Sequence, residues 1–158
     1  MNKINIPTLP EEEQKSPTGK YHSFCRNISL ALGAKRDVGQ WGGGHPFDLQ
    51  IRRVPPGAAV CPQHAHTVQF ELFVVISGTA TVRVDASTHT VQAGDAFVQT
   101  PGTAHQIHNT GPEDFIFYVI ADNPPTDSTY YPNSKKWMLK PQRKIFRLTE
   151  VDYFDGEE

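Results

Sequence analysis

The sequence predicts an all-β fold in which short antiparallel strands form a sandwich or barrel. Strand-favouring residues are frequent, with nine Phe and many Val and Thr, and 13 Pro and 12 Gly divide the 158 residues into short segments. Runs of β-forming residues recur at close spacing between turn residues, which is typical of sandwiches and barrels. No stretch has helical periodicity long enough to connect parallel strands, so a parallel α/β sheet is disfavoured. The length fits one compact domain.

The chain is predicted to begin with an arm over residues 1–20. This segment has three prolines, an acidic run at residues 11–13 and almost no hydrophobic pattern, as in a frayed terminus or a segment that docks on a partner. Residues 21–33 have a mixed apolar pattern. The segment 40–46 (QWGGGHP) contains three consecutive glycines and is predicted to be a mobile loop. The first strand is predicted over residues 47–54, where apolar and polar side chains alternate before a Pro-Pro-Gly turn.

Six further strands are predicted in the middle of the chain. Turn residues separate them, including a Ser-Gly pair after the first and a Thr-Pro-Gly sequence before the fifth. With the preceding elements they define a barrel over residues 21–122. The six predicted strands cover residues 71–76, 80–84, 89–91, 96–99, 106–108 and 115–121.

A C-terminal extension is predicted over residues 123–158. It contains six aromatic side chains, too many for a solvated linker. Apolar side chains within residues 145–151 fit one further strand or a short helix. The aromatic rings need a cover, and the two candidates are the outside of this barrel and a second subunit.

Composition excludes several classes of function. Fifteen Lys and Arg against 17 Asp and Glu give a net charge of −2, so the chain lacks the basic excess that binds nucleic acid. The longest apolar run, residues 72–76, is far shorter than the roughly 20 residues that cross a bilayer, and no signal-peptide core follows Met1. Cys25 and Cys61 form no CxxC pair, and both are expected to be reduced. These features predict a cytoplasmic protein without membrane or nucleic-acid partners.

Two histidines and a glutamate follow one another at a spacing that suits a metal site. His64 and His66 are two residues apart, so on a strand both side chains point to the same face. Glu71 follows five residues later, where a hairpin can fold it back beside the imidazoles. His105, just after the Thr-Pro-Gly turn, offers a fourth ligand. The alternative is that the histidines lie on the surface of an edge strand.

This arrangement resembles the cupin superfamily, whose two motifs are G-x5-H-x-H-x3,4-E-x6-G and G-x5-P-x-G-x2-H-x3-N. Two departures leave every ligand in place: Thr100 stands where the second motif has proline, and six residues instead of five separate Gly57 from His64. Fifteen residues separate the motifs, as in small microbial cupins. The residues that match the motifs are His64, His66, Glu71, Gly78, Gly94, Gly102, His105 and Asn109.

The resemblance implies a double-stranded β-helix, or jelly roll, in which His64, His66, Glu71 and His105 bind one divalent metal ion. The ion implied is Fe, Mn, Ni, Co, Cu or Zn, and the protein is expected to be a homodimer. The resemblance also implies an enzyme acting on a small oxygen-rich molecule. The reaction would be isomerisation or epimerisation of a sugar or sugar phosphate, or a dioxygenase or lyase reaction on an organic acid, with Glu71 as a catalytic base. The alternatives are a non-catalytic module that binds or senses a small molecule, and a purely structural barrel.

Side chains near these ligands have less specific patterns. One of Arg52 and Arg53 points inward if strand alternation continues, and it would then bind a carboxylate or phosphate; the alternative is a rim arginine paired with an aspartate. His108 is predicted on the face opposite to the fourth ligand. Cys61 is predicted to be a buried structural thiol on the face opposite to the first ligand. His45, in the glycine-rich loop, is a candidate for the barrel mouth.

Overall fold

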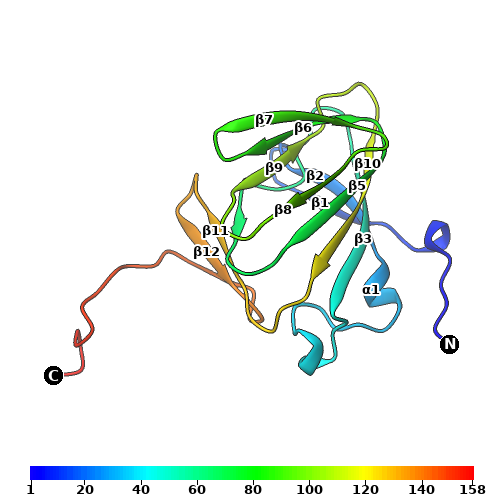
Figure 1. The fold of residues 1–158 in the computed structure, drawn as a ribbon. Coiled ribbons are helices and arrows are strands. Elements are labelled where there is room, and N and C mark those ends of the chain that lie inside the picture. Colours follow the sequence, from blue (N-terminus) through cyan, green and yellow to red (C-terminus); the bar gives the residue numbers. More distant parts are fainter.

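The computed structural model describes residues 1–158 and consists almost entirely of strands that surround a common interior (Figure 1). Every pair of named strands is antiparallel. One layer is a six-stranded sheet. Its strands, in spatial order, are β1 (Glu12–Lys15), β2 (His22–Asn27), β3 (Phe47–Val54), β10 (Phe115–Asp122), β5 (Glu71–Ser77) and β8 (Ala96–Gln99).

The second layer consists of two smaller sheets that meet at one backbone pair. The amide of His64 donates to the carbonyl of His105 (3.1 Å), and the amide of His105 donates back (2.8 Å). The predicted all-β double-stranded β-helix is therefore confirmed. One small sheet has the order β7 (Ser87–Gln92), β6 (Thr79–Val84) and β9 (His105–His108), and the other β13 (Lys144–Phe146), β12 (Lys136–Leu139), β11 (Ser128–Tyr131) and β4 (Ala65–His66).

Helical structure is limited to short segments outside the two layers. They are the helix α1 (Ile28–Ala31), which follows β2, and two 3-10 turns, Ile6–Thr8 and Gln40–Gly42. The second turn lies in the glycine-rich segment that the sequence predicts as a loop. No helix of the structure is long and apolar enough to cross a membrane.

The N-terminal segment contributes a strand that the sequence does not reveal. Residues 12–15, within the predicted arm, form β1 and pair with β2. All four side chains of β1 are exposed, so no alternation marks the strand. The carboxylate of Glu11 forms ion pairs with Arg26 (3.2 Å) and Arg53 (2.8 Å), and the hydrogen bond from Arg53 lowers the pKa of Glu11. These contacts help to hold the segment at the edge of the six-stranded sheet.

The apolar core lies between the layers and fills only part of the interior. Phe115, Phe117 and Val54 are its largest fully buried apolar side chains, alongside Val82. Burial of such side chains contributes about 2–3 kcal/mol each. Four core residues also line a cavity in the rest of the interior, so the apolar core forms one wall of this cavity. These residues are Phe73, Ile107, Phe117 and Val119.

The turn between β5 and β6 requires a glycine at position 78. Gly78, one of the motif glycines, has a φ of 82° there. A Cβ atom there would lie 2.6 Å from the carbonyl oxygen of Asp114. We expect Gly78→Ala to lower the free energy of unfolding by about 3 kcal/mol or more, measured by urea denaturation. Gly94→Ala is the control: its φ is 93° but no atom lies within 4 Å, so only the conformational cost of about 1–2 kcal/mol remains. Equal losses in both variants would contradict the steric argument.

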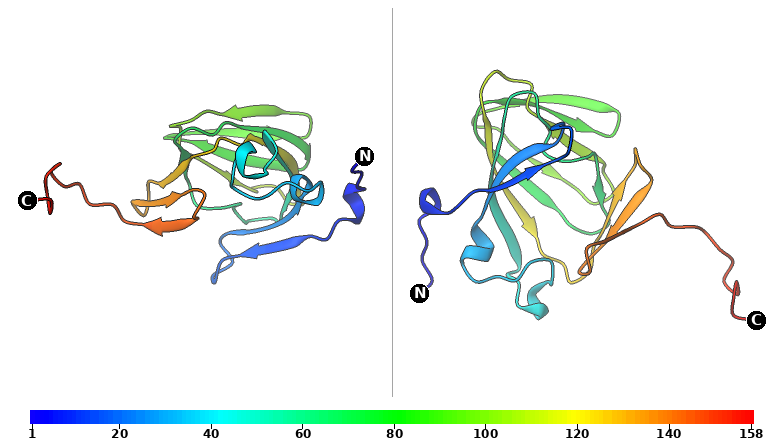
Figure 2. Two further views of the ribbon diagram at one scale, coloured as in Figure 1. Left: turned by 90° about the horizontal axis from the view of Figure 1, so that it is seen from below. Right: turned by 180° about the vertical axis from the view of Figure 1, so that it is seen from behind.

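The C-terminal extension divides into a hairpin packed on the barrel and a projecting tail. Tyr130 and Trp137, which pair across β11 and β12, pack against each other with tilted rings whose centroids are 4.8 Å apart. Strand β13 covers the beginning of the element predicted at residues 145–151, and no helix forms there. Residues 147–158 then run away from the barrel (Figures 1 and 2), and their large apolar side chains, including Leu148 and Tyr153, are exposed.

Candidate metal centre

The backbone pair between His64 and His105 brings the first two imidazoles together. Residues paired directly across antiparallel strands project their side chains to the same face. The two ring centroids lie 4.5 Å apart. His66, two residues after His64, projects to the same face, and its ring centroid lies 5.1 Å from that of His64. Three imidazoles from the second layer therefore enter the interior at the junction of its two small sheets.

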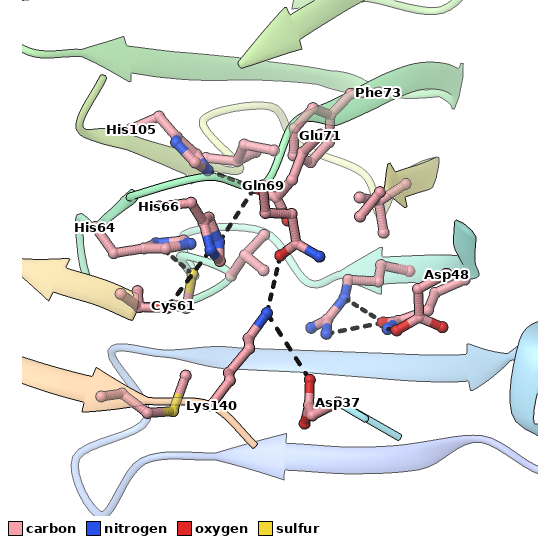
Figure 3. Close-up of a pocket in the computed structure, with 18 of the residues that line it drawn as sticks. Asp37, Asp48, Cys61, His64, His66, Gln69, Glu71, Phe73, His105 and Lys140 are labelled. Atoms are coloured by element: carbon pink, nitrogen blue, oxygen red, sulfur yellow. Dashed lines mark hydrogen bonds and ion pairs between the residues drawn. The ribbon is translucent and has the colours of Figure 1, made fainter. Parts of the chain in front are cut away.

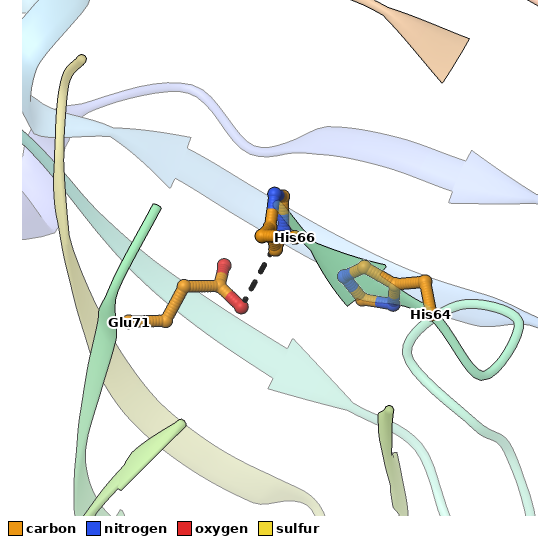
Figure 4. Close-up of side chains that lie close together, drawn as sticks. All are labelled: His64, His66 and Glu71. Atoms are coloured by element: carbon orange, nitrogen blue, oxygen red, sulfur yellow. Dashed lines mark ion pairs between the residues drawn. The ribbon is translucent and has the colours of Figure 1, made fainter. Parts of the chain in front are cut away.

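Glu71 reaches the same point from the opposite layer, because it is the first residue of β5. Its Oε2 atom lies 2.9 Å from Nε2 of His105 and 3.8 Å from Nε2 of His66. Candidate ligand atoms of His64, His66 and Glu71 all lie within 4.8 Å of one another. Figure 4 shows these three side chains close together. The structure thus brings together all four residues that the sequence singles out.

Hydrogen bonds fix which nitrogen of each imidazole faces the centre. Nδ1 of His66 contacts a carboxylate oxygen of Asp127 at 2.6 Å, and Nδ1 of His64 contacts the carbonyl oxygen of Pro62 at 3.0 Å. Nδ1 of His105 contacts the carbonyl oxygen of Thr103 at 3.4 Å. His105 also has its Nε2 close to an acceptor, Oε2 of Glu71 at 2.9 Å. Since the oxygens of Asp127 and Pro62 only accept, Nδ1 of His66 and of His64 carries a proton, which leaves Nε2 as the atom that can bind a metal. This is the form in which histidine binds a metal.

Asp127 is the functional residue that sequence reasoning missed. It lies just before β11 in the C-terminal extension, and its side chain has no exposed surface. One oxygen accepts from His66, and the other accepts from the backbone amides of Thr67 and Val68, both at 3.1 Å. Burial alone would raise the pKa of Asp127, but the bond with His66 and the charge of Lys140 hold it well below its usual range. A buried carboxylate therefore orients His66.

Glu71 is also ionised at neutral pH. Burial alone would raise its pKa, but the contact with His105 and the electrostatic influence of the three nearby histidines lower the pKa of Glu71 to about 2. Its Oε2 atom is buried, and no donor is aligned to form a hydrogen bond with it. Buried polar atoms without a partner are uncommon in native structures. An unpartnered carboxylate oxygen beside three imidazoles has the donor chemistry of a divalent metal site.

The four side chains lie at one end of a cavity of about 340 Å³, a size typical of small-molecule sites. Figure 3 shows His64 on one side, Asp48 on the other and Lys140 reaching between them. Nζ of Lys140 donates to Gln69 (2.9 Å) and lies 3.4 Å from Asp127. The charged lining residues are Arg36, Asp37, Asp48, Arg52, Glu71, Lys140 and Arg143. The amide-bearing ones are Gln14, Gln50, Gln69, Gln106 and Asn123.

The structure decides between the alternatives for the neighbouring residues. Arg52 lines the cavity, whereas Arg53 points outward and pairs with acidic residues. His108 is exposed, as predicted. The prediction that Cys61 points away from the first ligand is wrong: Cys61 lines the cavity with Sγ 3.6 Å from the His64 ring, because the chain before β4 is irregular and strand alternation does not apply. Burial raises the pKa of the Cys61 thiol to about 11, so it stays protonated. His45 does not line the cavity.

Comparison with known proteins agrees with this architecture. The Cupin domain family matches residues 50–121. The chain is similar to an oxalate-binding protein of Thermotoga maritima, at 29% identity over 68 residues that make up 43% of this chain and 55% of that protein. The match thus spans about half the length of this curated relative.

Two solved structures resemble almost the whole chain. A protein of Acidithiobacillus ferrooxidans proposed to be a sugar phosphate isomerase has a TM-score of 0.76 at 18% identity, over 93% of this chain and 92% of that one. A sugar phosphate isomerase of the cupin superfamily from Silicibacter pomeroyi has a TM-score of 0.73 at 20% identity, over 91% and 90%. At these identities the likeness shows the fold. The family match over residues 50–121 and the motif residues support membership of the cupin superfamily.

Proposed function

We propose that the protein is a metal-dependent enzyme that acts on a small oxygen-rich anion, with one divalent metal held by His64, His66, Glu71 and His105. The observation that carries the proposal is the buried, unpartnered Oε2 of Glu71, which lies beside the imidazoles of His64, His66 and His105. Imidazole and carboxylate ligands suit Fe, Mn, Ni, Co, Cu or Zn. A metal bound there would act as a Lewis acid on a substrate oxygen.

The cavity favours a sugar phosphate over a two-carbon acid as the substrate. Its volume of about 340 Å³ is several times that of oxalate, and many of its lining side chains can form hydrogen bonds. Amide and charged side chains of this kind suit a molecule with several hydroxyl groups and one anionic group. The sugar phosphate isomerases that share the fold support this choice, whereas the oxalate-binding relative covers less than half of the chain. We infer an isomerase or epimerase reaction.

The cavity residues have distinct roles in this proposal. Lys140 is held between Asp127 and Gln69, where its ammonium group can bind a substrate oxygen. Burial raises the pKa of Tyr131, so its hydroxyl stays protonated and can donate a hydrogen bond. A pKa of about 2 makes Glu71 a weak base at neutral pH and favours its role as a ligand. The role of Glu71 as a catalytic base stays a prediction.

The test is turnover by the metal-loaded protein. Aldose and ketose phosphates are incubated with protein reconstituted separately with Mn²⁺, Zn²⁺, Ni²⁺ and Fe²⁺, and interconversion is followed by NMR. The expected result is conversion that a chelator abolishes and that Glu71→Gln lacks. Binding without turnover would instead support a non-catalytic sensing module, and oxygen-dependent consumption of keto acids would support a dioxygenase.

We also propose that the protein is a homodimer formed through the outer face of β5 and β8. Leu72 and Val98 are paired across these strands, and both are substantially exposed, at 42% and 53%. Ile76 and Phe70 extend the same apolar surface. Exposed contiguous apolar patches mark interfaces.

Val98→Lys is expected to raise the dimer dissociation constant about a hundredfold or more, because it places an unpaired charge in the interface. Light scattering coupled to size-exclusion chromatography measures the change. Thr88→Lys, on the exposed strand β7, is the control with the same added charge and should leave the mass unchanged. A wild-type protein that is monomeric at micromolar concentration would contradict the proposal.

A further inference from the structure

Arg52 lies on the inner face of the six-stranded sheet. It shares this face of β3 with Asp48 and Gln50, and all three line the cavity. Its neighbours in register are Cys25 of β2 and Phe117 of β10, both buried. The guanidinium group is therefore flanked by side chains that cannot balance its charge, and a partly buried charge is costly unless it is paired.

The polar partners of Arg52 are all neutral. Nε (3.2 Å) and one terminal nitrogen (3.0 Å) donate to the amide oxygen of Gln50. The other terminal nitrogen donates to Gln14 (3.2 Å) and Ser23 (3.5 Å). No ion pair of the structure includes Arg52. A guanidinium group has five donors, so at least one stays free while the amides hold the group in place.

The adjacent Arg53 differs from Arg52 because acidic partners balance its charge. It points to the opposite face, pairs with the carboxylates of Glu11 (2.8 Å) and Asp114 (2.9 Å), and lies over the ring of Phe24. Arg52 has no comparable set of partners. Asp48, the acidic residue on its own face, contacts Gln50 instead.

The other cations of the cavity have acidic partners. Lys140 lies 3.4 Å from Asp127, and Arg143 lies 3.2 Å from Asp37. Arg36 pairs with Glu12 at 3.6 Å. Arg52 is thus the cavity cation without a countercharge.

We propose that Arg52 is a specificity-determining residue that binds the anionic group of the substrate, a phosphate or a carboxylate, while the substrate's hydroxyl and carbonyl oxygens lie toward the four ligands. This inference rests on the proposed function and specifies its substrate: an anionic sugar derivative long enough to reach from β3 to the histidines. Figure 3 places Asp48, four residues before Arg52 on the same strand, across the cavity from His64. Arginine suits this task because its charge is permanent and its remaining free donor can form a charge-assisted hydrogen bond with a phosphate or carboxylate oxygen.

The experiment measures binding of three probes by calorimetry: glucose 6-phosphate, gluconate and glucose, which carry a phosphate, a carboxylate and no charge. The variants are Arg52→Gln and Arg52→Lys, and the control is Arg83→Gln, an exposed arginine outside the cavity with the same change in charge. We expect Arg52→Gln to weaken binding of an anionic probe about tenfold or more, with glucose and the control unaffected. Arg52→Lys keeps the charge and should recover part of the affinity. Of the two anionic probes, the one whose affinity falls more in Arg52→Gln carries the group that Arg52 recognises.

Other results would overturn the inference. They are equal binding of the anionic probes by wild type and both Arg52 variants, equal loss of all three probes, and no binding of either anionic probe by the wild type at millimolar concentration. Metal content, measured on the same samples, distinguishes a failure of the inference about Arg52 from a failure of the proposed function. A protein that binds no metal but depends on Arg52 for anions would keep the subsite and lose the metalloenzyme.

Discussion

His105→Ala is expected to reduce bound metal from about one equivalent per chain to below about 0.1 equivalent, because it removes one of four ligands from a site that must hold the ion against buffer. His64→Ala should have the same effect, since its imidazole lies beside that of His105. Catalytic turnover should be lost in both variants. Metal is measured by inductively coupled plasma mass spectrometry after dialysis.

The matched control is His108→Ala. His108 lies on the same strand, β9, three residues from His105, but it is exposed and its ring contacts the carbonyl oxygen of Gly57. This variant should keep the wild-type metal content. Full metal content in both His64→Ala and His105→Ala would show that the ligand assignment is wrong.

Asp127→Asn is expected to weaken metal binding about 10–100-fold while the ligands themselves stay intact. The carboxylate of Asp127 accepts the Nδ1 proton of His66 at 2.6 Å, which directs Nε2 toward the centre. An asparagine can present its amide group in either orientation and carries no charge, so the orientation of the ring is less fixed. Chelator competition with Zn²⁺ gives the dissociation constant.

Asp152→Asn is the control for this variant, because Asp152 lies in the projecting tail and is exposed. It should bind Zn²⁺ as tightly as wild type. Circular dichroism and the melting temperature establish whether Asp127→Asn remains folded, since Asp127 also accepts from two backbone amides. A folded Asp127→Asn variant with wild-type affinity would mean that Asp127 stabilises the loop and does not orient the ligand.

The central barrel could be predicted because its strands obey local rules. Strand β3 matches residues 47–54 and β8 matches residues 96–99, and the other central strands differ from their predicted bounds by one or two residues at an end. Apolar and polar residues alternate in β3, and every second side chain of β10 is buried. The four ligands were found by motif spacing, which is also local.

The remaining features depend on contacts between distant residues. Strand β1 has four exposed side chains and exists because of its backbone pairing with β2. Asp127 lies 61 residues from His66 in the sequence, and nothing in its neighbourhood marks it as part of the site. Lys140 likewise reaches the cavity from a distant part of the sequence, the loop after β12. Cys61 was misplaced because the alternation rule was applied to an irregular segment.

The central claim is that His64, His66, Glu71 and His105 form a metal site. The most direct measurement is the metal content of untagged protein purified without chelators, by inductively coupled plasma mass spectrometry. We predict about one equivalent of Fe, Mn, Ni, Co, Cu or Zn per chain. Absence of metal, also after incubation with each of these ions, would contradict the account and leave a cupin barrel that binds its ligand without a metal.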